Sequence, residues 1–162
     1  MKPARGGVRR GNDSAGGGQL ETRILEGKPL AAAIRDDVSK RAAVLSGSGR
    51  PVTVAIILVG DDPGSRIYSQ SIRKAAGKLG IETTLEEIGE DDGAGAVAAS
   101  IRSLSDDPSV SGIIVQQPLP KGIPSGVVEE IAPSKDIDGA TTLSLGRLFA
   151  GRDAFAPATA LG

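Results

Sequence analysis

Residues 52–88 read VTVAIILVGDDPGSRIYSQSIRKAAGKLGIETTLEEI and contain a strand, a helix and a second strand in close succession. The run VTVAIILVG is almost continuously apolar and β-branched, which is typical of a strand buried on both faces. A helix from about Ser65 to Leu79 follows, with Ser65 as its candidate N-cap, and IETTLEEI predicts the next strand. A strand–helix–strand unit of this kind predicts a parallel sheet.

The same alternation continues on both sides of this unit. Apolar residues at Leu30, Ile34, Val38 and Leu45, three or four positions apart or multiples of these, predict a helix between residues 29 and 46. Downstream, GAGAVAASIRSLS predicts another helix and VSGIIVQ a second buried strand. The expected fold class is therefore α/β, with three layers, α/β/α, around a mainly parallel sheet.

Composition limits the classes of function. A chain of 162 residues with 39% hydrophobic and 24% charged residues can form one soluble domain with its own core. The formal net charge is −1 and no basic face stands out, which argues against nucleic acid and membrane surfaces as partners. Without cysteine or histidine the chain lacks two common metal ligands, so no metal site is predicted. The absence of cysteine also fits a reducing cytoplasm.

The N-terminal segment differs from the rest of the chain. Residues 1–22 are basic and glycine-rich, with no apolar run long enough for a signal sequence or a membrane span. They are expected to be a disordered tail. An amphipathic transit peptide is the alternative, which the glycines disfavour because they oppose helix formation. The folded domain is thus expected over residues 23–162.

Ligands of parallel α/β sheets bind beyond the carboxyl ends of the strands, so the loops after AIILVG and GIIVQ are the first candidates for a site. The helix after the first loop carries Tyr68, the only tyrosine of the chain. Tyr68 shares an apolar stripe with Ile72, Ala75 and Leu79. Two interpretations stay open: a core residue whose hydroxyl found a partner, or a side chain that binds a ligand.

The second loop reads VQQPLPKGIP and begins at Gln116. An amide at the end of a buried strand can donate and accept at once, which suits a neutral ligand rich in heteroatoms, although the prolines also fit a plain turn. Further on, KDIDG places Asp136 and Asp138 two positions apart, which predicts both carboxylates on one side of an extended segment. Two acids before a glycine more often form a turn than a site.

Three motifs taken together resemble a known family. VGDDPGSRIYSQSIRKAAGKLGI, GIIVQQPLP and APSKDIDG…GRL, in this order, are similar to the N-terminal catalytic domain of the methylenetetrahydrofolate dehydrogenase/cyclohydrolase family, over residues 24–159. The resemblance implies a fold like the N-terminal domain of the amino-acid dehydrogenases. It also implies tetrahydrofolate derivatives as substrates, a homodimer as the intact assembly, and a pterin site at the cleft toward a following dinucleotide-binding domain.

The resemblance implies a role for each matched position. Tyr68 would line or stack on the folate ring and Gln116 would contact the reacting one-carbon unit, and these two are the candidate catalytic residues. Pro118 and Leu119 would complete the substrate site next to Gln116. Asp138 would accept hydrogen bonds from the pterin amino and ring N–H groups, while Asp136 is expected to be mainly a turn residue. A carboxylate that receives two parallel N–H donors discriminates against rings that leave those groups unpaired.

The chain departs from the family pattern at one position of the helix. The bifunctional members carry a lysine four residues after the tyrosine, which they use in the hydrolytic step, and this chain has Ile72 there. Lys74 is about 120° around the helix from Tyr68 and roughly 9 Å along it, so it should not reach the vacated position easily. The resemblance therefore implies NAD(P)-dependent oxidation of 5,10-methylenetetrahydrofolate, and the missing lysine argues against cyclohydrolase activity.

The second departure concerns length. In the family a Rossmann-type domain binds NADP or NAD, whereas this sequence ends at FAPATALG, where the linker to that domain is expected to begin. No glycine-rich dinucleotide fingerprint precedes that end, so no cofactor-binding residue is predicted in this chain. The alternative to an enzyme domain is a truncated, non-catalytic domain that binds folate or serves in oligomerisation.

Overall fold

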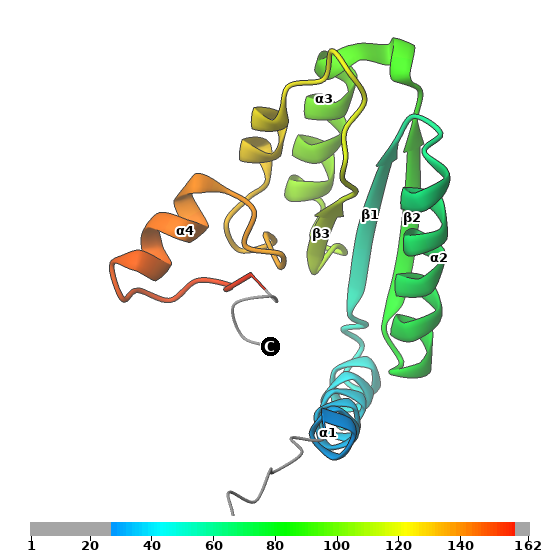
Figure 1. The fold of residues 1–162 in the computed structure, drawn as a ribbon. Coiled ribbons are helices and arrows are strands. Elements are labelled where there is room, and N and C mark those ends of the chain that lie inside the picture. The colour runs from blue at the N-terminus through cyan, green and yellow to red at the C-terminus, as the bar shows by residue number, and fades with distance from the viewer. Residues whose placement is uncertain (1–26, 158–162) are drawn as a thin grey trace, which may run out of the picture.

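The computed structural model describes residues 27–157 (Figure 1). The predicted tail over residues 1–22 and the chain after residue 157 lie outside the described residues. The elements, in chain order, are α1 (Gly27–Gly47), β1 (Thr53–Val59), α2 (Pro63–Lys78), β2 (Glu82–Ile88), η1 (Glu90–Asp92), α3 (Gly93–Asp106), β3 (Gly112–Val115), η2 (Ser125–Glu130) and α4 (Thr142–Phe149). The helices and strands predicted above are all present, and only β3 is clearly shorter than its predicted segment, 110–116.

β1 is the centre of a three-stranded sheet with the order β2–β1–β3. Both pairings are parallel, with Thr53 opposite Glu82 and Val54 opposite Gly112. The parallel sheet predicted from the sequence is thus confirmed. Every residue of β1 except Val54 is buried, because the strand has a neighbour on each edge and helices on both faces.

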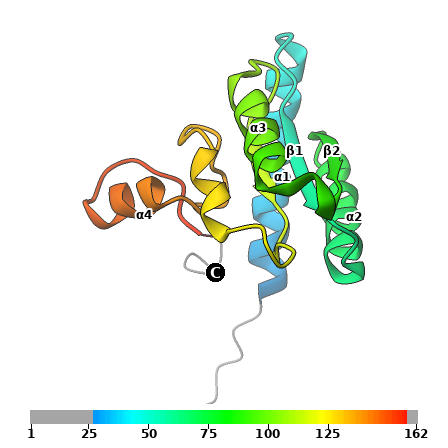
Figure 2. The same ribbon diagram turned by 90° about the horizontal axis from the view of Figure 1, so that it is seen from above.

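Helices cover the two faces of the sheet in different ways. On one face, α3 and η2 enclose an apolar core with β1 and β3, in which Val97, Ile101 and Ile113 are fully buried. On the other face lies α2, which contacts β1 and β2. Seen from above, α3, the strands and α2 form successive layers (Figure 2). The three-layer α/β/α fold is therefore confirmed.

α2 turns a polar face toward the sheet, although its sequence carries an apolar stripe. Ser65 and Ser69 are its buried residues, and the Ser69 hydroxyl donates to the Ser65 carbonyl oxygen at 2.6 Å. Tyr68 is 62% exposed and Ile72 is partly buried, so the interpretation of Tyr68 as a core residue is wrong. Small serines whose hydroxyls bond to the backbone let a helix approach a sheet closely, whereas a tyrosine needs more room.

The start of α2 also differs from the prediction. Its N-cap is Asp62, whose carboxylate accepts a hydrogen bond from the Ser65 amide at 2.7 Å. Pro63 occupies the first helical position, where its fixed φ angle suits a helix start and its missing N–H is not needed. Ser65 therefore lies inside the first turn, and its hydroxyl is free to bond elsewhere.

α1 buries only a small part of its surface among the described residues. Ala42 is buried, whereas Leu30 is 66% and Ile34 is 54% exposed. The apolar spacing thus predicts the helix correctly, and Ala42, four positions after Val38, lies on the predicted stripe, although much of that stripe is exposed. α1 crosses near the amino ends of the strands, beside the C-terminal end of α2 (Figure 1).

The segment after η2 returns to the free edge of β3. Asp136 forms an isolated parallel bridge with Ile113, and Ile137 packs directly over Gly112. A Cβ atom at Gly112 would lie 2.6 Å from Ile137 Cγ2, so this approach requires glycine. The contact fixes where the chain leaves the sheet.

The two aspartates of this segment point to different environments. Asp136 is completely buried and Asp138 is exposed, so the prediction that both carboxylates lie on one side of an extended segment is wrong. The reason is that the chain turns: the Gly139 amide donates to the Asp136 carbonyl oxygen at 3.1 Å. Gly139 has a φ angle of 60°, which favours glycine at this turn.

Candidate functional site

Three segments that follow or flank strands of the parallel sheet carry the predicted site residues. The loop after β1 leads into α2 and Tyr68, the loop after β3 begins at Gln116, and the turn beside β3 carries Asp138. The carboxyl ends of parallel strands lie at one edge of a sheet. The bridge between Ile113 and Asp136 is parallel as well, so the chain approaches Asp138 in the direction in which β3 approaches Gln116.

A hydrogen bond joins the first two segments. Ser65 Oγ, in the first turn of α2, donates to the carbonyl oxygen of Gln117 at 3.2 Å. The backbone N–H of Gln116 donates to the Ile57 carbonyl oxygen at 2.9 Å and extends the β1–β3 ladder by one residue. The peptide bond between Gln117 and Pro118 is cis. The position of the Gln116 loop is thus tied both to β1 and to the helix of Tyr68.

Ser65 is a site residue that the sequence analysis missed in this role. A serine three positions before the tyrosine looks like a cap, and the pattern contains no signal for its distant partner in the other loop. The Asp62 carboxylate caps the helix by accepting a hydrogen bond from the Ser65 amide, so the Ser65 hydroxyl is not needed as a cap and can bond to Gln117. The hydrogen bond from the Ser65 backbone amide lowers the pKa of Asp62 and favours its ionised form.

Gln116 has an unusual environment for an amide side chain. It is only 4% exposed, and its Nε2 atom has no hydrogen-bond partner among the described residues. A buried donor without a partner costs about 1–3 kcal/mol relative to a satisfied one. An unsatisfied group of this kind at the carboxyl edge of a parallel sheet is a reason to expect a bound ligand there.

Pro118 and Leu119, which follow Gln116 and Gln117 in the chain, line a pocket that does not include Gln116 in its wall. The pocket has a volume of about 390 Å³ and also includes Val59, Asp61 and Glu90 in its wall. Of the residues predicted to bind substrate, it therefore contains these two. Tyr68 and Asp138 do not line it, and both are exposed.

Asp136 organises the turn that presents Asp138. Its carboxylate accepts hydrogen bonds from the Ala140 amide at 2.9 Å, the Thr141 amide at 2.9 Å and the Thr141 hydroxyl at 2.7 Å. Burial opposes ionisation, but the hydrogen bonds outweigh it and lower the pKa of Asp136 below its usual value. The residue therefore acts within the turn, with its charge satisfied by neighbours on the chain.

Asp138 carries no such internal partners. Its side chain is exposed, and no hydrogen bond from the described part of the chain reaches its carboxylate. The Tyr68 ring is likewise free of contacts that would bury it. The described residues thus include an exposed carboxylate, an exposed phenol ring and a buried amide donor without a partner, which are groups that suit a flat, polar ligand.

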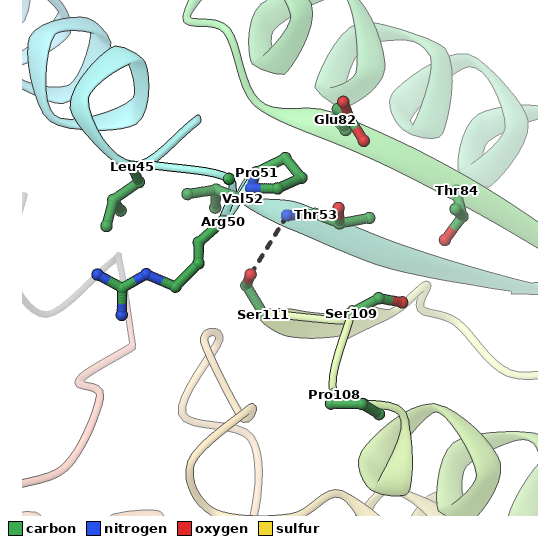
Figure 3. A pocket seen from close by; sticks show the side chains of 11 residues that line it. Leu45, Arg50, Pro51, Val52, Thr53, Glu82, Thr84, Pro108, Ser109 and Ser111 are labelled. Carbon is green, nitrogen blue, oxygen red and sulfur yellow. Dashed lines mark hydrogen bonds between the residues drawn. The ribbon is translucent and has the colours of Figure 1, made fainter. Parts of the chain in front are cut away.

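A larger hollow lies at the opposite end of the sheet. It has a volume of about 630 Å³ and lies at the amino ends of the strands, between Thr53, Glu82 and Ser111 (Figure 3). The Thr53 amide donates a hydrogen bond of 3.3 Å to the Ser111 hydroxyl, and both residues line the hollow (Figure 3). Parallel sheets bind ligands beyond their carboxyl ends, so we place the functional site at the other edge.

The described residues contain neither a candidate metal site nor a candidate membrane-spanning helix. Residues 27–157 contain no group of three or more acidic, histidine or cysteine side chains placed to hold a metal ion. The helices in the same range include none that is long and apolar enough to cross a membrane.

A model of one protein family matches most of this sequence. Residues 25–138 match the model of the family described as tetrahydrofolate dehydrogenase/cyclohydrolase, catalytic domain. The chain belongs to this family. The resemblance inferred from three motifs is therefore confirmed, and the span that matches the tetrahydrofolate dehydrogenase/cyclohydrolase model includes Tyr68, Gln116 and Asp138.

Relatives in the tetrahydrofolate dehydrogenase/cyclohydrolase family are similar over most of this chain. The bifunctional protein FolD of Herminiimonas arsenicoxydans is 42% identical over 144 residues, which cover 88% of this chain and 51% of that protein. The bifunctional protein FolD 1 of Saccharopolyspora erythraea is 44% identical over 140 residues, which cover 86% and 48%. The chain thus spans about half the length of these relatives.

Solved structures agree with the sequence relatives. The bifunctional FolD methylenetetrahydrofolate dehydrogenase/cyclohydrolase of Campylobacter jejuni superposes with a TM-score of 0.80 at 36% identity, over 83% of this chain and 49% of that one. A 5,10-methylenetetrahydrofolate dehydrogenase from the silkworm Bombyx mori gives a TM-score of 0.79 at 38% identity, over 86% and 49%. The fold of the catalytic domain in this family is therefore also the fold of this chain.

Proposed function

We propose that this domain supplies the folate side of the active site of an NAD(P)-dependent 5,10-methylenetetrahydrofolate dehydrogenase in one-carbon metabolism. Family membership supports the class of reaction. The observation that carries the proposal is the Gln116 amide, buried without a partner at the carboxyl edge of the sheet. A ligand with an acceptor near the reacting carbon would satisfy it.

The proposed roles follow from the environment of each residue. The Asp138 carboxylate accepts hydrogen bonds from the pterin amino and ring N–H groups, and Pro118 and Leu119 contact the substrate beside it. The Tyr68 ring packs against the flat part of the folate. Removal of a hydride from the methylene carbon leaves a cationic product, and the side-chain oxygen of Gln116, an acceptor held in a buried position before the reaction, would favour that developing charge.

The cofactor belongs to a second domain in this proposal. The structure of the Trypanosoma brucei methylenetetrahydrofolate dehydrogenase–cyclohydrolase is a complex with NADP, and this chain covers 48% of that one. We expect NADP or NAD to accept the hydride, held by a domain outside this sequence. The described residues alone would bind folate without binding the dinucleotide.

Cyclohydrolase activity is not part of the proposal, because of Ile72. It lies one helical turn after Tyr68, at the position where the bifunctional members of the family carry a lysine, and it is partly buried. Lys74 lies in the wall of a different hollow, between α1 and α2. No amine therefore occupies the position from which a water molecule beside Tyr68 would be activated.

The oligomeric state, the location and the partners of the intact protein are proposed from the family resemblance. We propose a homodimer that works in the cytoplasm, without nucleic acid or membrane as partner. The formal net charge of −1 and the absence of cysteine support that environment. Light scattering after size-exclusion chromatography of the chain joined to a cofactor domain tests the dimer.

Replacing Gln116 by methionine tests the proposed site, because two properties should change in opposite directions. The substitution keeps the length of the side chain and removes the unpaired donor, so the free energy of unfolding should stay the same or rise by about 1 kcal/mol. The affinity for a folate analogue should fall by about 1–3 kcal/mol. Thermal unfolding and calorimetric titration of the same samples measure both.

Gln117→Met is the matched control, because Gln117 is the same residue type, one position along and exposed. It should change neither property. If Gln116→Met binds the analogue as tightly as the parent chain, the amide has no ligand and the site is misplaced. A chain that binds folate but shows no dehydrogenase activity when joined to an active cofactor domain would favour the non-catalytic alternative.

A further inference from the structure

Lys135 caps a helix to which it does not belong. Its ammonium donates to the carbonyl oxygens of Leu104 at 3.0 Å and Asp107 at 2.5 Å, both at the C-terminal end of α3. The last carbonyl groups of a helix have no partner within it, and a cation next to them interacts favourably with the helix dipole. α3 has no basic residue in its own last turn, so Lys135 supplies that charge from 31 positions beyond Leu104.

A second hydrogen bond joins the same two segments. Ser105 Oγ, in the last turn of α3, accepts from the Ala132 amide at 3.1 Å. α3 itself is held firmly, because Val97 and Ile101 are fully buried in the apolar core. Its C-terminal end is therefore a rigid anchor for residues 132–135.

The main chain of Lys135 connects this anchor to the turn that carries Asp138. Its carbonyl oxygen accepts from the Ile113 amide of β3 at 2.8 Å and from the Ile137 amide at 2.9 Å. One carbonyl group thus fixes both the contact with the sheet and the start of the turn. The ammonium holds the same residue to α3, so two elements set the direction in which the chain leaves toward Asp138.

The stability of α3 alone is a weak reason for this arrangement. A helix C-terminus at the surface can be satisfied by water or by residues that directly follow it. Ordering a lysine side chain instead costs up to about 2 kcal/mol of rotamer freedom. What the distant lysine adds is a fixed position for its own segment, and that segment reaches Asp138 three positions later.

We infer that Lys135 is a positioning residue for the reaction: its ammonium holds the turn in the place from which the Asp138 carboxylate meets the N–H donors of the pterin. The inference rests on the proposed function, because that function assigns the pterin to Asp138. Lys135 itself touches no substrate. It acts by ordering the turn before the ligand arrives, which removes the entropy cost of ordering it on binding.

Substitutions in the full 162-residue chain test the inference. Lys135→Met keeps the aliphatic stem and removes the ammonium, and it should weaken binding of pteroylglutamate about tenfold, on the scale of one hydrogen bond to a charged group. Lys135→Arg keeps a cation that can donate to the same carbonyl groups, and it should restore most of the affinity. Ser105→Ala removes the second link to α3 and should weaken binding about threefold. Calorimetric titration measures all three.

A double-mutant cycle separates positioning from a merely structural role. In a chain that already carries Asp138→Ala, Lys135→Met should have little further effect on affinity, because the carboxylate that it positions is gone. NMR titration at millimolar pteroylglutamate follows these weaker complexes. A structural role predicts the same loss in both backgrounds, and that result would overturn the inference.

Ile101→Val is the matched control, because it shortens a fully buried side chain of α3 and leaves the hydrogen bonds of Lys135 in place. It should lower stability and keep the affinity. A loss of affinity as large as that of Lys135→Met would show that any weakening of α3 has this effect, and the specific role of Lys135 would be wrong.

Hydrogen exchange of the ligand-free chain separates this inference from the proposed function. The Asp136 carboxylate protects the amides of Ala140 and Thr141, each at 2.9 Å. Lys135→Met should speed the exchange of these two amides about tenfold relative to those of β1, and Lys135→Arg should not. If pteroylglutamate does not bind the parent chain, the proposed function fails. Faster exchange confined to the turn then still supports the ordering role of Lys135, and unchanged exchange overturns it.

Discussion

The two faces of the sheet are held by different kinds of contact. On the α3 face, Val97 and Ile101 pack into a closed apolar core. On the α2 face, Ser65 and Ser69 are buried and Tyr68 stands outside. The first face fixes the fold by filling volume, whereas on the second face the Ser69 hydroxyl bonds within α2 and the Ser65 hydroxyl joins the helix to the Gln117 carbonyl oxygen. The difference suggests that α3 serves stability and α2 serves the site.

The largest expected effect is on the α3 face. Ile101→Ala removes a fully buried side chain and should lower the free energy of unfolding by about 2–5 kcal/mol. Ile67→Ala is the same truncation on α2, where the side chain is 65% exposed, and should cost less than about 1 kcal/mol. Urea denaturation followed by circular dichroism measures both. Similar losses for the two variants would mean that α2 is as important for stability as α3.

The second prediction compares two carboxylates that lie two positions apart. Asp138→Ala should weaken binding of a folate analogue by about 2–4 kcal/mol, because two N–H donors of the pterin lose their acceptor. Its effect on stability should be small, since Asp138 is exposed. Asp136→Asn should instead lower stability. If Asp136→Asn abolishes binding in a folded chain while Asp138→Ala binds normally, the two roles are exchanged.

The third prediction adds a function to the α2 face. In a fusion to the cofactor domain of a bifunctional relative, the parent sequence should hydrolyse methenyltetrahydrofolate little faster than the uncatalysed rate. Ile72→Lys should raise that rate by about 10²-fold or more, the usual scale for one positioned acid or base. Decay of the absorbance of methenyltetrahydrofolate measures it, and Lys74→Gln is the control. Fast hydrolysis by the parent fusion would show that another group performs this step.

The smallest effect concerns the pH dependence of the turn. The pKa of Asp136 is lowered in the folded chain, because hydrogen bonds from Ser144, Thr141 and Ala140 outweigh the effect of burial. Its contribution is then fully present above its ordinary value of 3.8 and is lost as the pH falls through the lower, folded value. Asp136→Asn should lose about 1–3 kcal/mol at neutral pH and show a flatter decline below pH 4 than the parent chain. Equal slopes in acid would exclude this role.

The sequence is sufficient to predict the order of elements, because apolar runs and helical periods depend on local pattern. It is also sufficient for the carboxyl-edge site, since parallel strands place their following loops together. It does not predict the face that α2 buries. Hydrophobicity selects the stripe of Tyr68 and Ile72, whereas the buried face consists of serines whose hydroxyls are satisfied by Ser65 O and Gln117 O.

Long-range geometry accounts for the remaining differences. The pattern KDIDG contains no sign that Asp136 is enclosed by Thr141 and Ala140, because those partners follow a turn that local spacing does not predict. The unpaired state of Gln116 is also invisible in the sequence. It depends on which groups of other segments come within reach, and the fold decides that.

The close approach of Ile137 to Gly112 has a consequence for variation among relatives. The missing side chain at one position makes space for the branched side chain at the other, so the two sites share one volume. A residue larger than glycine at position 112 should then appear together with a smaller residue at position 137. In an aligned set of natural sequences the pair should therefore covary, although 25 positions separate the two along the chain.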